Sequence, residues 1–543
     1  MNLLYLYFST IRHLKFSQIY HRIFRHFSRR IPVPSSSLEK RENFSPRAFF
    51  EKKKSILNKN SFIFLNQKEE LNLPNDWTSQ SHSALWIYNL HYFDGLLSSK
   101  TSLDLKLSLL ERWISENTNK LSVGWDPYPL SLRIINLIKF AWLNNIEKDS
   151  INVSLAIQAR YLSKNLEKHL LGNHLLENAK ALIFSGVYFS GKEPKKWLQK
   201  GIRILKQQLE EQILDDGGHF ELSPMYHSIS IELIQDILVL CCTEDCPRIL
   251  KKEEISLKEY LDKMTKWLIS MTHKDLEISY FNDSVPGIAS KPYDLIKRSE
   301  RILRKNFIKE ENDFIYLKDS GYIRVENKDS LLLFDVAPIG PKYLSGHSHA
   351  DTLSIEVSLF SKRVIVNSGT SVYEEGKRRS FERSTEAHST LTINKKSSSQ
   401  VWASFRTGRR AYPKLITKEI NKDSIYIEAE HDGYSRIFRK LKHLRKIIHS
   451  ENSISIEDNI IASKSTPFEV NFFFHPGVSC KINEDRMGGE LSLSQSTISW
   501  SVKEGSCFLS KSEYAVGFNL LESNDCLTVV SPLGKKTIFE LSW

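Results

Sequence analysis

The chain has 543 residues, of which 41% are hydrophobic and 26% are charged, as in an ordinary soluble globular protein. This length exceeds what one hydrophobic core usually supports, so we expect two or three domains. The six cysteines form no CxxC pair and no regular framework, which argues against a zinc ribbon or a disulfide scaffold. The net charge of +12 predicts an anionic partner: nucleic acid, a membrane surface or an acidic polysaccharide.

The N-terminal segment is predicted to be a basic helical arm over residues 1–60. Its first thirty residues carry six Lys and Arg side chains and no acidic one, and residues 3–8 are apolar or aromatic. This apolar run precedes the charges and is too short for a clear signal peptide, so the compartment stays open between cytoplasm and periplasm. No stretch approaches the roughly eighteen apolar residues of a transmembrane segment. We expect the arm to dock on the domain behind it, with peripheral membrane contact as the alternative.

The sequence from there to about residue 305 has the periodicity of helices. Apolar residues recur at three-and-four spacing in seven segments, 103–121, 128–145, 153–171, 175–189, 197–214, 226–242 and 257–271. Short breaks with Gly or Pro separate several of these segments. Helices in series, without strands between them, predict a domain of stacked antiparallel helical hairpins over residues 61–312.

The pattern changes near Phe314, where short β-branched or alternating segments begin. They are residues 322–326, 330–335, 353–359, 363–366, 389–393, 424–429, 454–460 and 468–474. No crossover helices lie between them, which favours antiparallel pairing. Residues 313–543 are therefore predicted to form an antiparallel β-sandwich.

One motif of this second half contains two closely spaced histidines. Residues 346–351 read Gly-His-Ser-His-Ala-Asp, and a further histidine, His388, follows about forty residues later. If His347 and His349 lie on a strand, their side chains point to the same side of it. Three such groups could bind zinc, or divide metal binding and catalysis between them. A polar pair on a solvated sheet face is the structural alternative.

A second group of polar residues lies at predicted helix starts. Asn173 and His174 stand at a break between helices, with Glu177 on the same face as His174 one turn later. Tyr226 and His227 open another helix and follow a Gly-Gly loop. This concentration of acid–base groups favours a cleft over a core face. An N-cap role for Asn173 and a buried, hydrogen-bonded Tyr226 are the structural alternatives.

Two stretches interleave aromatic with polar residues. Residues 86–94 contain Tyr88 and His91, and residues 125–136 contain Arg133. Aromatic rings stack on the apolar faces of sugars, while Arg and Asn reach hydroxyls or carboxylates. These side chains are therefore candidates for substrate binding, although a Trp-rich helix–helix contact would give the same pattern.

Five motifs in order resemble the heparinase II/III-like family of polysaccharide lyases over nearly the whole chain. They are residues 86–94 (WIYNLHYFD), 173–178 (NHLLEN), 216–227 (DGGHFELSPMYH), 346–351 (GHSHAD) and 386–390 (EAHST). The resemblance implies an incomplete (α/α) toroid of helical hairpins followed by an antiparallel β-sandwich, with the active site between them. It also implies β-elimination on an anionic, uronic-acid-containing polysaccharide, with structural zinc as the only cofactor.

The resemblance assigns roles by matching position. β-Elimination must neutralise the uronate carboxylate, remove the C5 proton and protonate the departing O4 oxygen. Asn173 and His174 would neutralise the carboxylate with support from Glu177. Tyr226 would transfer a proton as base or acid, and His347 would be its partner. The remaining candidates for substrate contact are His227, Tyr373 and Arg383.

The same resemblance matches His349 and His388 to structural zinc ligands. Where the family commonly has Asp before a Pro-Gly pair as the third ligand, this chain has Asn367 followed by Ser-Gly. Asn is neutral and binds zinc more weakly than a carboxylate does. We therefore expect weak or absent zinc binding.

Three other functions compete with the lyase. A metal-dependent hydrolase of the amidohydrolase type also begins with HxH, but it needs alternating strands and helices afterwards, and here strand follows strand. Nucleic-acid binding is not expected, because the basic residues are spread and no recognition motif appears. A non-catalytic polysaccharide-binding or surface-polysaccharide assembly protein that retains the lyase fold is the main alternative, which the altered Asn367 keeps open.

Overall fold

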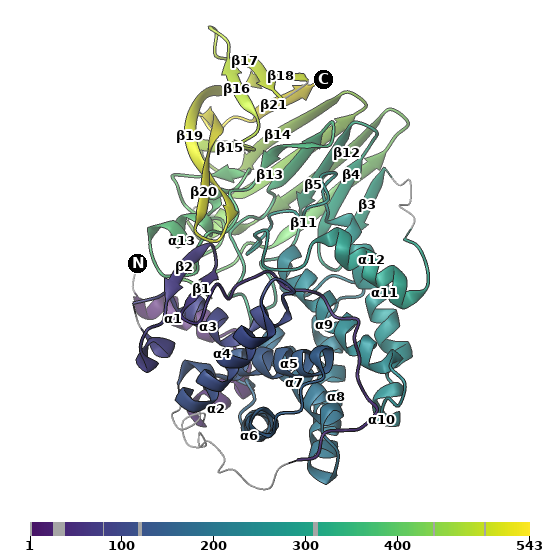
Figure 1. Cartoon of the computed structure of the whole chain (residues 1–543). Helices are drawn as coiled ribbons and strands as arrows, with labels where there is room; N and C mark the ends of the chain where they lie inside the picture. Colours follow the sequence, from purple (N-terminus) through teal and green to yellow (C-terminus); the bar gives the residue numbers. More distant parts are fainter. Residues whose placement is uncertain are drawn as a thin grey trace.

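The computed structural model describes residues 3–24, 38–79, 81–117, 122–307, 313–437, 440–493 and 496–543. It consists of a helical domain followed by a β domain (Figure 1). The predicted boundary between residues 312 and 313 falls at the end of residues 308–312, which lie outside the described part. The first strand of the β domain, β3, begins at Phe314. The predicted fold class, helices first and antiparallel strands after, is confirmed.

The helical domain is built from helices that pack on helices close to them in the chain. They are α3 (Ala84–Tyr92), α4 (Leu103–Asn117), α5 (Pro127–Asn144), α6 (Asp149–Lys164), α7 (Gly172–Tyr188), α8 (Lys192–Gln212), α9 (Pro224–Cys242), α10 (Arg248–Lys251), α11 (Glu254–Ser270) and α12 (Pro292–Leu303). Helix α7 packs against α5 and α8, and α9 packs against α11 and α12. All seven predicted helical segments are present, although residues 118–121 of the first lie outside the described part.

Helix α9 carries a predicted catalytic residue and is strongly apolar. Within the described residues it is the one helix long and apolar enough to cross a bilayer, but 83% of its apolar stretch is buried in the protein. Its apolar side chains belong to the main core of the helical domain. It is therefore a core helix that begins at the domain interface.

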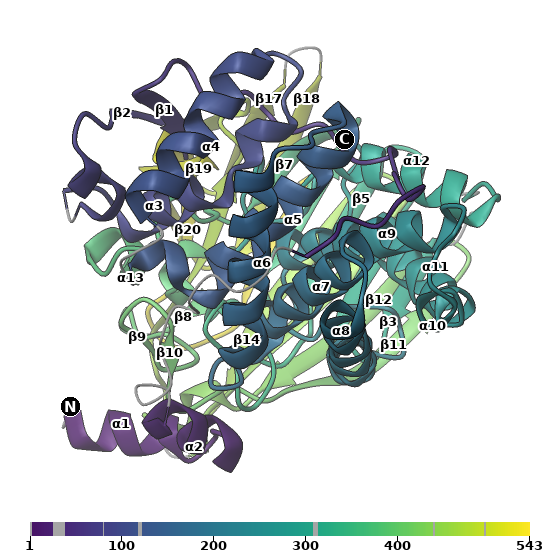
Figure 2. The same cartoon turned by 60° about the horizontal axis from the view of Figure 1, so that its bottom comes forward.

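Among the described residues of the predicted N-terminal arm, only those before residue 25 form helices. Helices α1 (Leu3–Ile11) and α2 (Phe16–Phe24) lie apart from the other helices (Figure 2). Residues 25–37 of the predicted arm lie outside the described part, and residues 38–60 contain no helix. They run in extended form along the helical domain, where the Arg41 N–H donates to the Tyr188 carbonyl at 2.8 Å.

A short hairpin also departs from the all-helical expectation for this half. Strands β1 (Ser61–Phe64) and β2 (Gln67–Glu70) pair antiparallel, with Phe62 buried at 1% exposure in the core of the helical domain. The two-residue turn between them, Leu65 and Asn66, has positive φ at both positions, which matches the twist of a tight hairpin.

The β domain consists of two antiparallel sheets. One contains β3 (Phe314–Leu317), β4 (Tyr322–Glu326), β5 (Ser330–Asp335), β6 (Ile355–Leu359), β7 (Lys362–Val366), β8 (Leu391–Thr392), β15 (Phe468–Phe474), β19 (Ser506–Gly517) and β20 (Leu520–Ser531). The other contains β11 (Pro413–Ile420), β12 (Ser424–His431), β13 (Lys442–Ser450), β14 (Ser453–Ile461), β16 (Ser479–Ile482), β17 (Gly488–Ser492), β18 (Thr497–Glu504) and β21 (Thr537–Ser542). Side chains from both sheets share one core, as a sandwich requires.

Candidate active site at the domain interface

Tyr226 and His347, the predicted proton-transfer pair, meet at the interface of the two domains. Tyr226 lies in the first turn of α9, and its N–H donates to the hydroxyl of the N-cap residue Ser223 at 3.2 Å. His347 lies in the connection between β5 and β6 of the β domain. Their rings pack with centroids 4.0 Å apart and an interplanar angle of 34°. The structure therefore brings a phenol and an imidazole together from distant parts of the chain.

Asp283, in the loop between α11 and α12, is the anchor of this arrangement. Its carboxylate accepts hydrogen bonds from the Arg379 guanidinium at 2.5 and 2.7 Å, from His347 Nδ1 at 2.9 Å and from His349 Nε2 at 2.8 Å. Burial opposes ionisation, but the charge of Arg379 and the histidine hydrogen bonds hold the pKa of Asp283 well below its usual range. An ionised Asp283 makes Nδ1 the proton-bearing nitrogen of a neutral His347, which leaves Nε2 able to accept a proton.

The two histidines lie in a loop, so the prediction of a strand is wrong. Residues 341–350 form turns and irregular backbone between β5 and β6. The backbone of this loop is held by Arg383, which is 1% exposed and donates to the carbonyls of Ser348 at 2.9 Å and Ala403 at 3.1 Å. The predicted substrate contact by Arg383 is therefore corrected: its guanidinium is buried and positions the histidine loop.

Glu221 connects the proton-transfer pair to the predicted carboxylate site. The side chain is 2% exposed, and its Oε2 lies 4.0 Å from His347 Nε2. It also lies beside the backbone of Gly172 and Asn173 at the start of α7, where a Cβ on Gly172 would come within 3.2 Å of Oε1. Burial raises the pKa of this carboxyl. Asn173 is 6% exposed, and its side chain makes no hydrogen bond to another described residue, which makes its amide a candidate ligand-binding group.

His174 directly follows Asn173 and lies beside the Glu167 carboxyl group. Its Nδ1 lies 3.2 Å from Glu167 Oε2, and its ring packs on Tyr128 with centroids 4.3 Å apart. Burial disfavours the imidazolium, but the charge and hydrogen bond of Glu167 raise the pKa of His174 above its ordinary value. An imidazole whose pKa is raised, next in sequence to an Asn amide, suits an anionic ligand.

A second tyrosine completes the group around Tyr226. The hydroxyls of Tyr226 and Tyr373 lie 3.1 Å apart, and the Tyr373 ring packs edge-on against Phe518 at the tip of the β19–β20 hairpin. Burial and the neighbouring Tyr373 and Asp283 raise the pKa of Tyr226 well above its ordinary value. Tyr226 is consequently a neutral phenol in this structure. Tyr373, a predicted substrate contact, therefore lies beside Tyr226.

Two other predicted residues lie behind or beside the site. Glu177 is 3% exposed and lies 3.9 Å from Lys180, which pairs in turn with the buried Asp236 at 2.8 Å. Its contacts are with this internal charge cluster, beneath Tyr128. The half-buried Tyr88 donates its hydroxyl to Asp126 at 3.1 Å.

The predicted substrate contacts of His91 and Arg133 are corrected, because both side chains are fully buried in the helical domain. His91 Nδ1 accepts from the Trp113 indole at 3.1 Å, and its Nε2 lies 3.0 Å from the Trp77 carbonyl. Arg133 donates to Gln158 at 2.9 Å and lies over the Trp113 ring at 4.0 Å. Both side chains hydrogen-bond within the core, although Arg133 Nη2 has no partner there, and neither is exposed at the interface.

The predicted substrate contact of His227 is also corrected, the fourth after Arg383, His91 and Arg133. It is 0% exposed, its Nδ1 accepts from the His219 N–H at 3.2 Å, and its Nε2 donates to the Met264 carbonyl at 2.9 Å. Burial lowers the pKa of His227 to about 3, so the ring is neutral. It fixes the Gly-Gly loop to α11, although it directly follows Tyr226 in sequence.

The predicted zinc ligands supply two nitrogens and no anionic third group. His349 Nδ1 and His388 Nε2 lie 3.1 Å apart, close to the roughly 3.3 Å expected for two nitrogens on one tetrahedral zinc. The Asn367 amide, however, accepts from the Ser389 N–H at 3.0 Å and lies 3.5 Å from the Ser354 hydroxyl. No group of three His, Cys, Asp or Glu side chains in the described ranges comes together to hold a metal. The residues present do not complete a structural zinc site.

Several site residues escaped sequence analysis, namely Asp283, Arg379, Glu221, Glu167 and Tyr128. Tyr128 and Glu221 stand within stretches already notable for aromatic and acid–base groups, so their neighbourhood carried a signal. Asp283 carried none, because its partners His347 and Arg379 lie 64 and 96 residues later in the chain.

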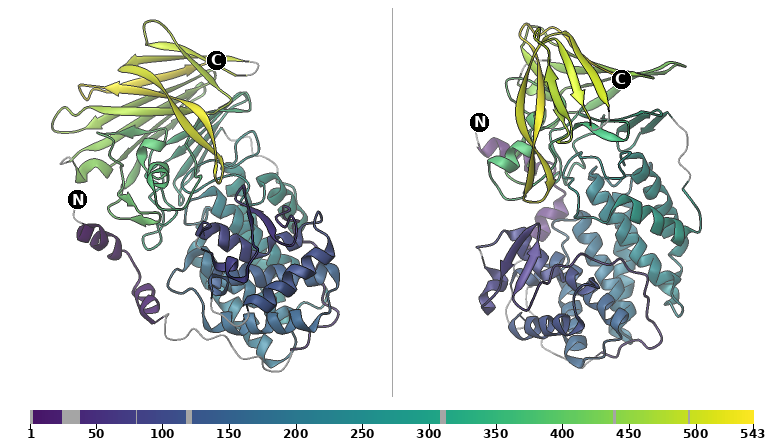
Figure 3. Two further views of the ribbon diagram at one scale, coloured as in Figure 1. Left: turned by 60° about the vertical axis from the view of Figure 1, so that its left-hand side comes forward. Right: turned by 45° about the horizontal axis from the view of Figure 1, so that its top comes forward.

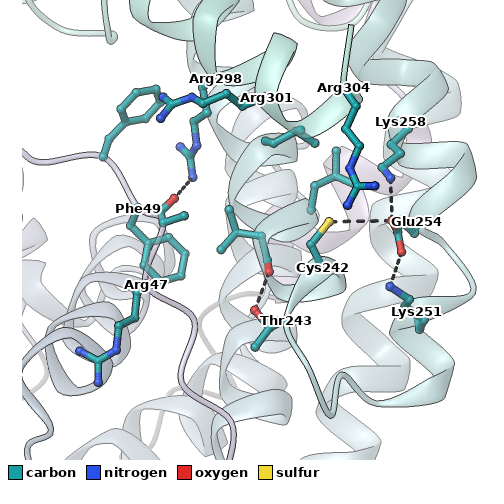
Figure 4. Close-up of a pocket in the computed structure, with 15 residues that line it drawn as sticks. Arg47, Phe49, Cys242, Thr243, Lys251, Glu254, Lys258, Arg298, Arg301 and Arg304 are labelled. Carbon is teal, nitrogen blue, oxygen red and sulfur yellow. Dashed lines mark hydrogen bonds and ion pairs between the residues drawn. The ribbon is translucent and has the colours of Figure 1, made fainter.

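A separate basic cavity of about 530 Å³ lies at the opposite end of α9 (Figure 4). Its cationic lining residues are Arg47, Lys251, Lys258, Arg298, Arg301 and Arg304. The one acidic lining residue, Glu254, pairs with Lys251 at 2.6 Å and Lys258 at 2.7 Å. At about 1.5 Å per helical residue, the cavity lies roughly 25 Å from Tyr226. It is therefore not part of the candidate active site.

The curated relatives and solved structures agree with this architecture. The chain is 24% identical over 336 residues to a heparin-sulfate lyase of Bacteroides stercoris, covering 58% of this chain and 47% of the relative. It is 26% identical over 265 residues to a heparin-sulfate lyase of Pedobacter heparinus, covering 44% of this chain and 38% of the relative. The chain thus spans less than half the length of either relative.

Two solved structures show the same fold. A crystal structure of heparinase III has a TM-score of 0.70 at 17% identity, covering 86% of this chain and 78% of that chain. The chondroitin AC lyase of Streptomyces coelicolor has a TM-score of 0.51 at 9% identity, covering 98% of this chain and 79% of that chain. The family model for the heparinase II/III N-terminus matches residues 116–306, and that for the heparinase II/III-like C-terminal region matches residues 309–543. The chain belongs to the heparinase II/III-like family.

Proposed function

We propose that this protein is a polysaccharide lyase that cleaves an anionic, uronic-acid-containing polysaccharide by β-elimination. The observation that carries the proposal is the packing of Tyr226 on His347 at 4.0 Å, at an interface that also presents Asn173 and His174. Membership of the heparinase II/III-like family and the named activity of its heparin-sulfate lyase relatives support the same reaction.

Asn173 and His174 would bind the uronate carboxylate. Glu167 raises the pKa of His174 and so favours the imidazolium, and the Asn173 amide adds a neutral donor. Together they would withdraw charge from the carboxylate and make the C5 proton more acidic. Since this stabilisation grows as negative charge develops on the carboxylate, it lowers the barrier rather than only improving binding.

His347 and Tyr226 would divide the proton transfers. His347 Nε2 takes the C5 proton, because Asp283 holds the Nδ1 proton and stabilises the resulting imidazolium. The C4–C5 double bond forms as the C4–O4 bond breaks, and the neutral phenol of Tyr226 protonates the departing O4. The two rings are adjacent, so the proton on His347 can then return to Tyr226 and restore the starting state.

The net charge of +12 supports an anionic polymer as substrate. The test is a panel of heparan sulfate, chondroitin sulfate, hyaluronan and alginate, read by ultraviolet absorbance of the unsaturated product. We expect product from at least one polymer with the native chain and a large loss with Tyr226→Phe. Tight binding of a polymer, with no unsaturated product from any of them, would instead support a non-catalytic polysaccharide-binding protein.

A further inference from the structure

The N-terminal arm, residues 3–24, docks on the protein through two buried polar residues and several half-buried ones, with Tyr7 packed on Trp402. Its two buried residues are Ser9, at 1% exposure, and Gln18, at 4%. The Gln18 amide donates to the carbonyls of Leu170 and Tyr343, at 3.5 and 3.4 Å. Ser9, in contrast, donates to the Leu6 carbonyl of its own helix at 2.9 Å. The buried positions of the arm are thus polar, although the half-buried Leu6 and Ile19 are not.

The outward side of the arm is apolar. On α2, Phe16 and Ile23 are 81% and 59% exposed, whereas Tyr20, at 48%, lines a pocket shared with Lys164 and Lys200 of the helical domain. On α1, Phe8 and Ile11 are 67% and 48% exposed. Of the 30 exposed large hydrophobic side chains in the described residues, 10 lie in this arm of 22 residues. Such a concentration marks an interaction surface.

The charge of the arm identifies the class of partner. Its ionisable side chains are Arg12, Lys15, Arg22 and two histidines, and it contains no acidic residue. A second copy of the arm would bring like charges together, whereas an anionic surface would complement them. We propose that the outer face of α1 and α2 lies in the headgroup region of an anionic lipid bilayer, with the exposed apolar side chains inserted and the exposed Arg12 and Arg22 at the phosphates.

The arm is tied to both domains, so lipid binding would orient the whole molecule. It lies along the side of the protein (Figure 3). On the β domain, Trp402 of β9 (Val401–Trp402) donates its indole N–H to Thr10 at 3.1 Å. On the helical domain, Lys15 pairs with Glu211 of α8. The carbonyls that hold Gln18 belong to the segments just before Asn173 and His347, which places the arm beside the candidate site.

Vesicle co-sedimentation with the full chain tests this proposal. We expect binding to vesicles of phosphatidylcholine with phosphatidylglycerol to be at least about tenfold tighter than to phosphatidylcholine alone, and to weaken with added salt. Replacing Phe8 and Phe16 together with Asp should weaken it at least about tenfold, because the inserted face then carries charge. The matched control is Leu533→Asp, a 65% exposed apolar residue in the turn after β20, which should bind as the native chain does.

Circular dichroism and thermal unfolding of the Phe8→Asp, Phe16→Asp variant should match the native chain, because neither side chain is buried. Absence of vesicle binding by the native chain would overturn the proposal. So would unchanged binding by the variant. If the native chain is a dimer, this variant is a monomer and neither binds lipid, the apolar face is instead a contact between two copies of the chain. None of these outcomes depends on lyase activity. The lipid-binding proposal is therefore tested independently of the proposed lyase function.

Discussion

Tyr226 and Asp283 are joined through a single hydroxyl, that of Ser223. The Ser223 Oγ accepts the N–H of Tyr226 at 3.2 Å and donates to the carbonyl of Asp283 at 2.6 Å. The same group therefore caps the helix that begins near Tyr226 and fixes the loop whose carboxylate orients His347. This connection explains how a phenol of one domain and an imidazole of the other keep a defined separation.

The hydroxyl of Tyr226 should be needed for turnover and dispensable for folding. Tyr226→Phe should lower kcat by roughly two to four orders of magnitude, the usual worth of a positioned acid–base group, with little change in Tm. Tyr434→Phe is the matched control, because its buried hydroxyl donates to the Leu391 carbonyl at 2.8 Å in the core of the β domain. That control should lower stability by about 1 kcal/mol and leave kcat unchanged. Undiminished lyase activity in Tyr226→Phe would remove the proposed acid.

The alkaline limb of the pH profile should depend on Glu167. Because the pKa of His174 is raised in the folded protein, its charge persists above pH 6.5 and is lost as the pH rises through the raised value. Any free energy of unfolding that the His174–Glu167 pair contributes is likewise fully present below about pH 6.5. It is lost as the pH rises through the raised pKa of His174. Glu167→Gln removes the carboxylate, so the alkaline limb of kcat/KM should move to lower pH. Glu193→Gln, whose partner Arg160 is remote from the site, should leave the limb in place.

Replacement of Asp283 should damage both folding and catalysis. Asp283→Asn leaves the fully buried Arg379 without its anion, which costs about 3–5 kcal/mol of unfolding free energy when a buried pair loses one partner. Urea unfolding measures this loss. Glu111→Gln breaks an exposed pair with Lys148 and should change stability by less than about 1 kcal/mol. A stable Asp283→Asn protein with native kcat would show that the carboxylate neither holds Arg379 nor orients His347.

Sequence patterns predicted the framework and only part of the site. Strands β4, β5 and β15 begin and end where their alternating or apolar runs do, because a buried sheet imposes a strict pattern along the chain. Helix α3 was missed, since its apolar residues cover most of its surface and leave no clear period. His91 and His227 looked like site residues because their partners, an indole N–H and a backbone carbonyl, come from other helices. Asp283 could not be predicted from the sequence, because the residues that it binds, His347 and Arg379, lie far away in the chain.

His91 should behave as a structural residue. His91→Ala leaves the Trp113 indole and the Trp77 carbonyl without partners and opens a cavity, so it should cost about 2–5 kcal/mol of unfolding free energy. The enzyme that remains folded should keep its KM. His174→Ala should show the opposite pattern, with a raised KM, a lowered kcat and a modest stability change. A raised KM in His91→Ala at full folding would restore the substrate-binding interpretation.

Asn367 should decide whether the His349–His388 pair holds zinc. A carboxylate at position 367 would add the anionic third ligand to two nitrogens already 3.1 Å apart. After dialysis against a chelator, we expect the native chain to retain little zinc and Asn367→Asp to retain close to one ion per chain. Added zinc should raise the Tm of Asn367→Asp, because a structural metal contributes its binding energy to folding. Adding His388→Ala to Asn367→Asp should abolish both effects. Stoichiometric zinc in the dialysed native chain would show that a neutral amide suffices here, and equal zinc loss from both proteins would show that the pair is only a hydrogen bond.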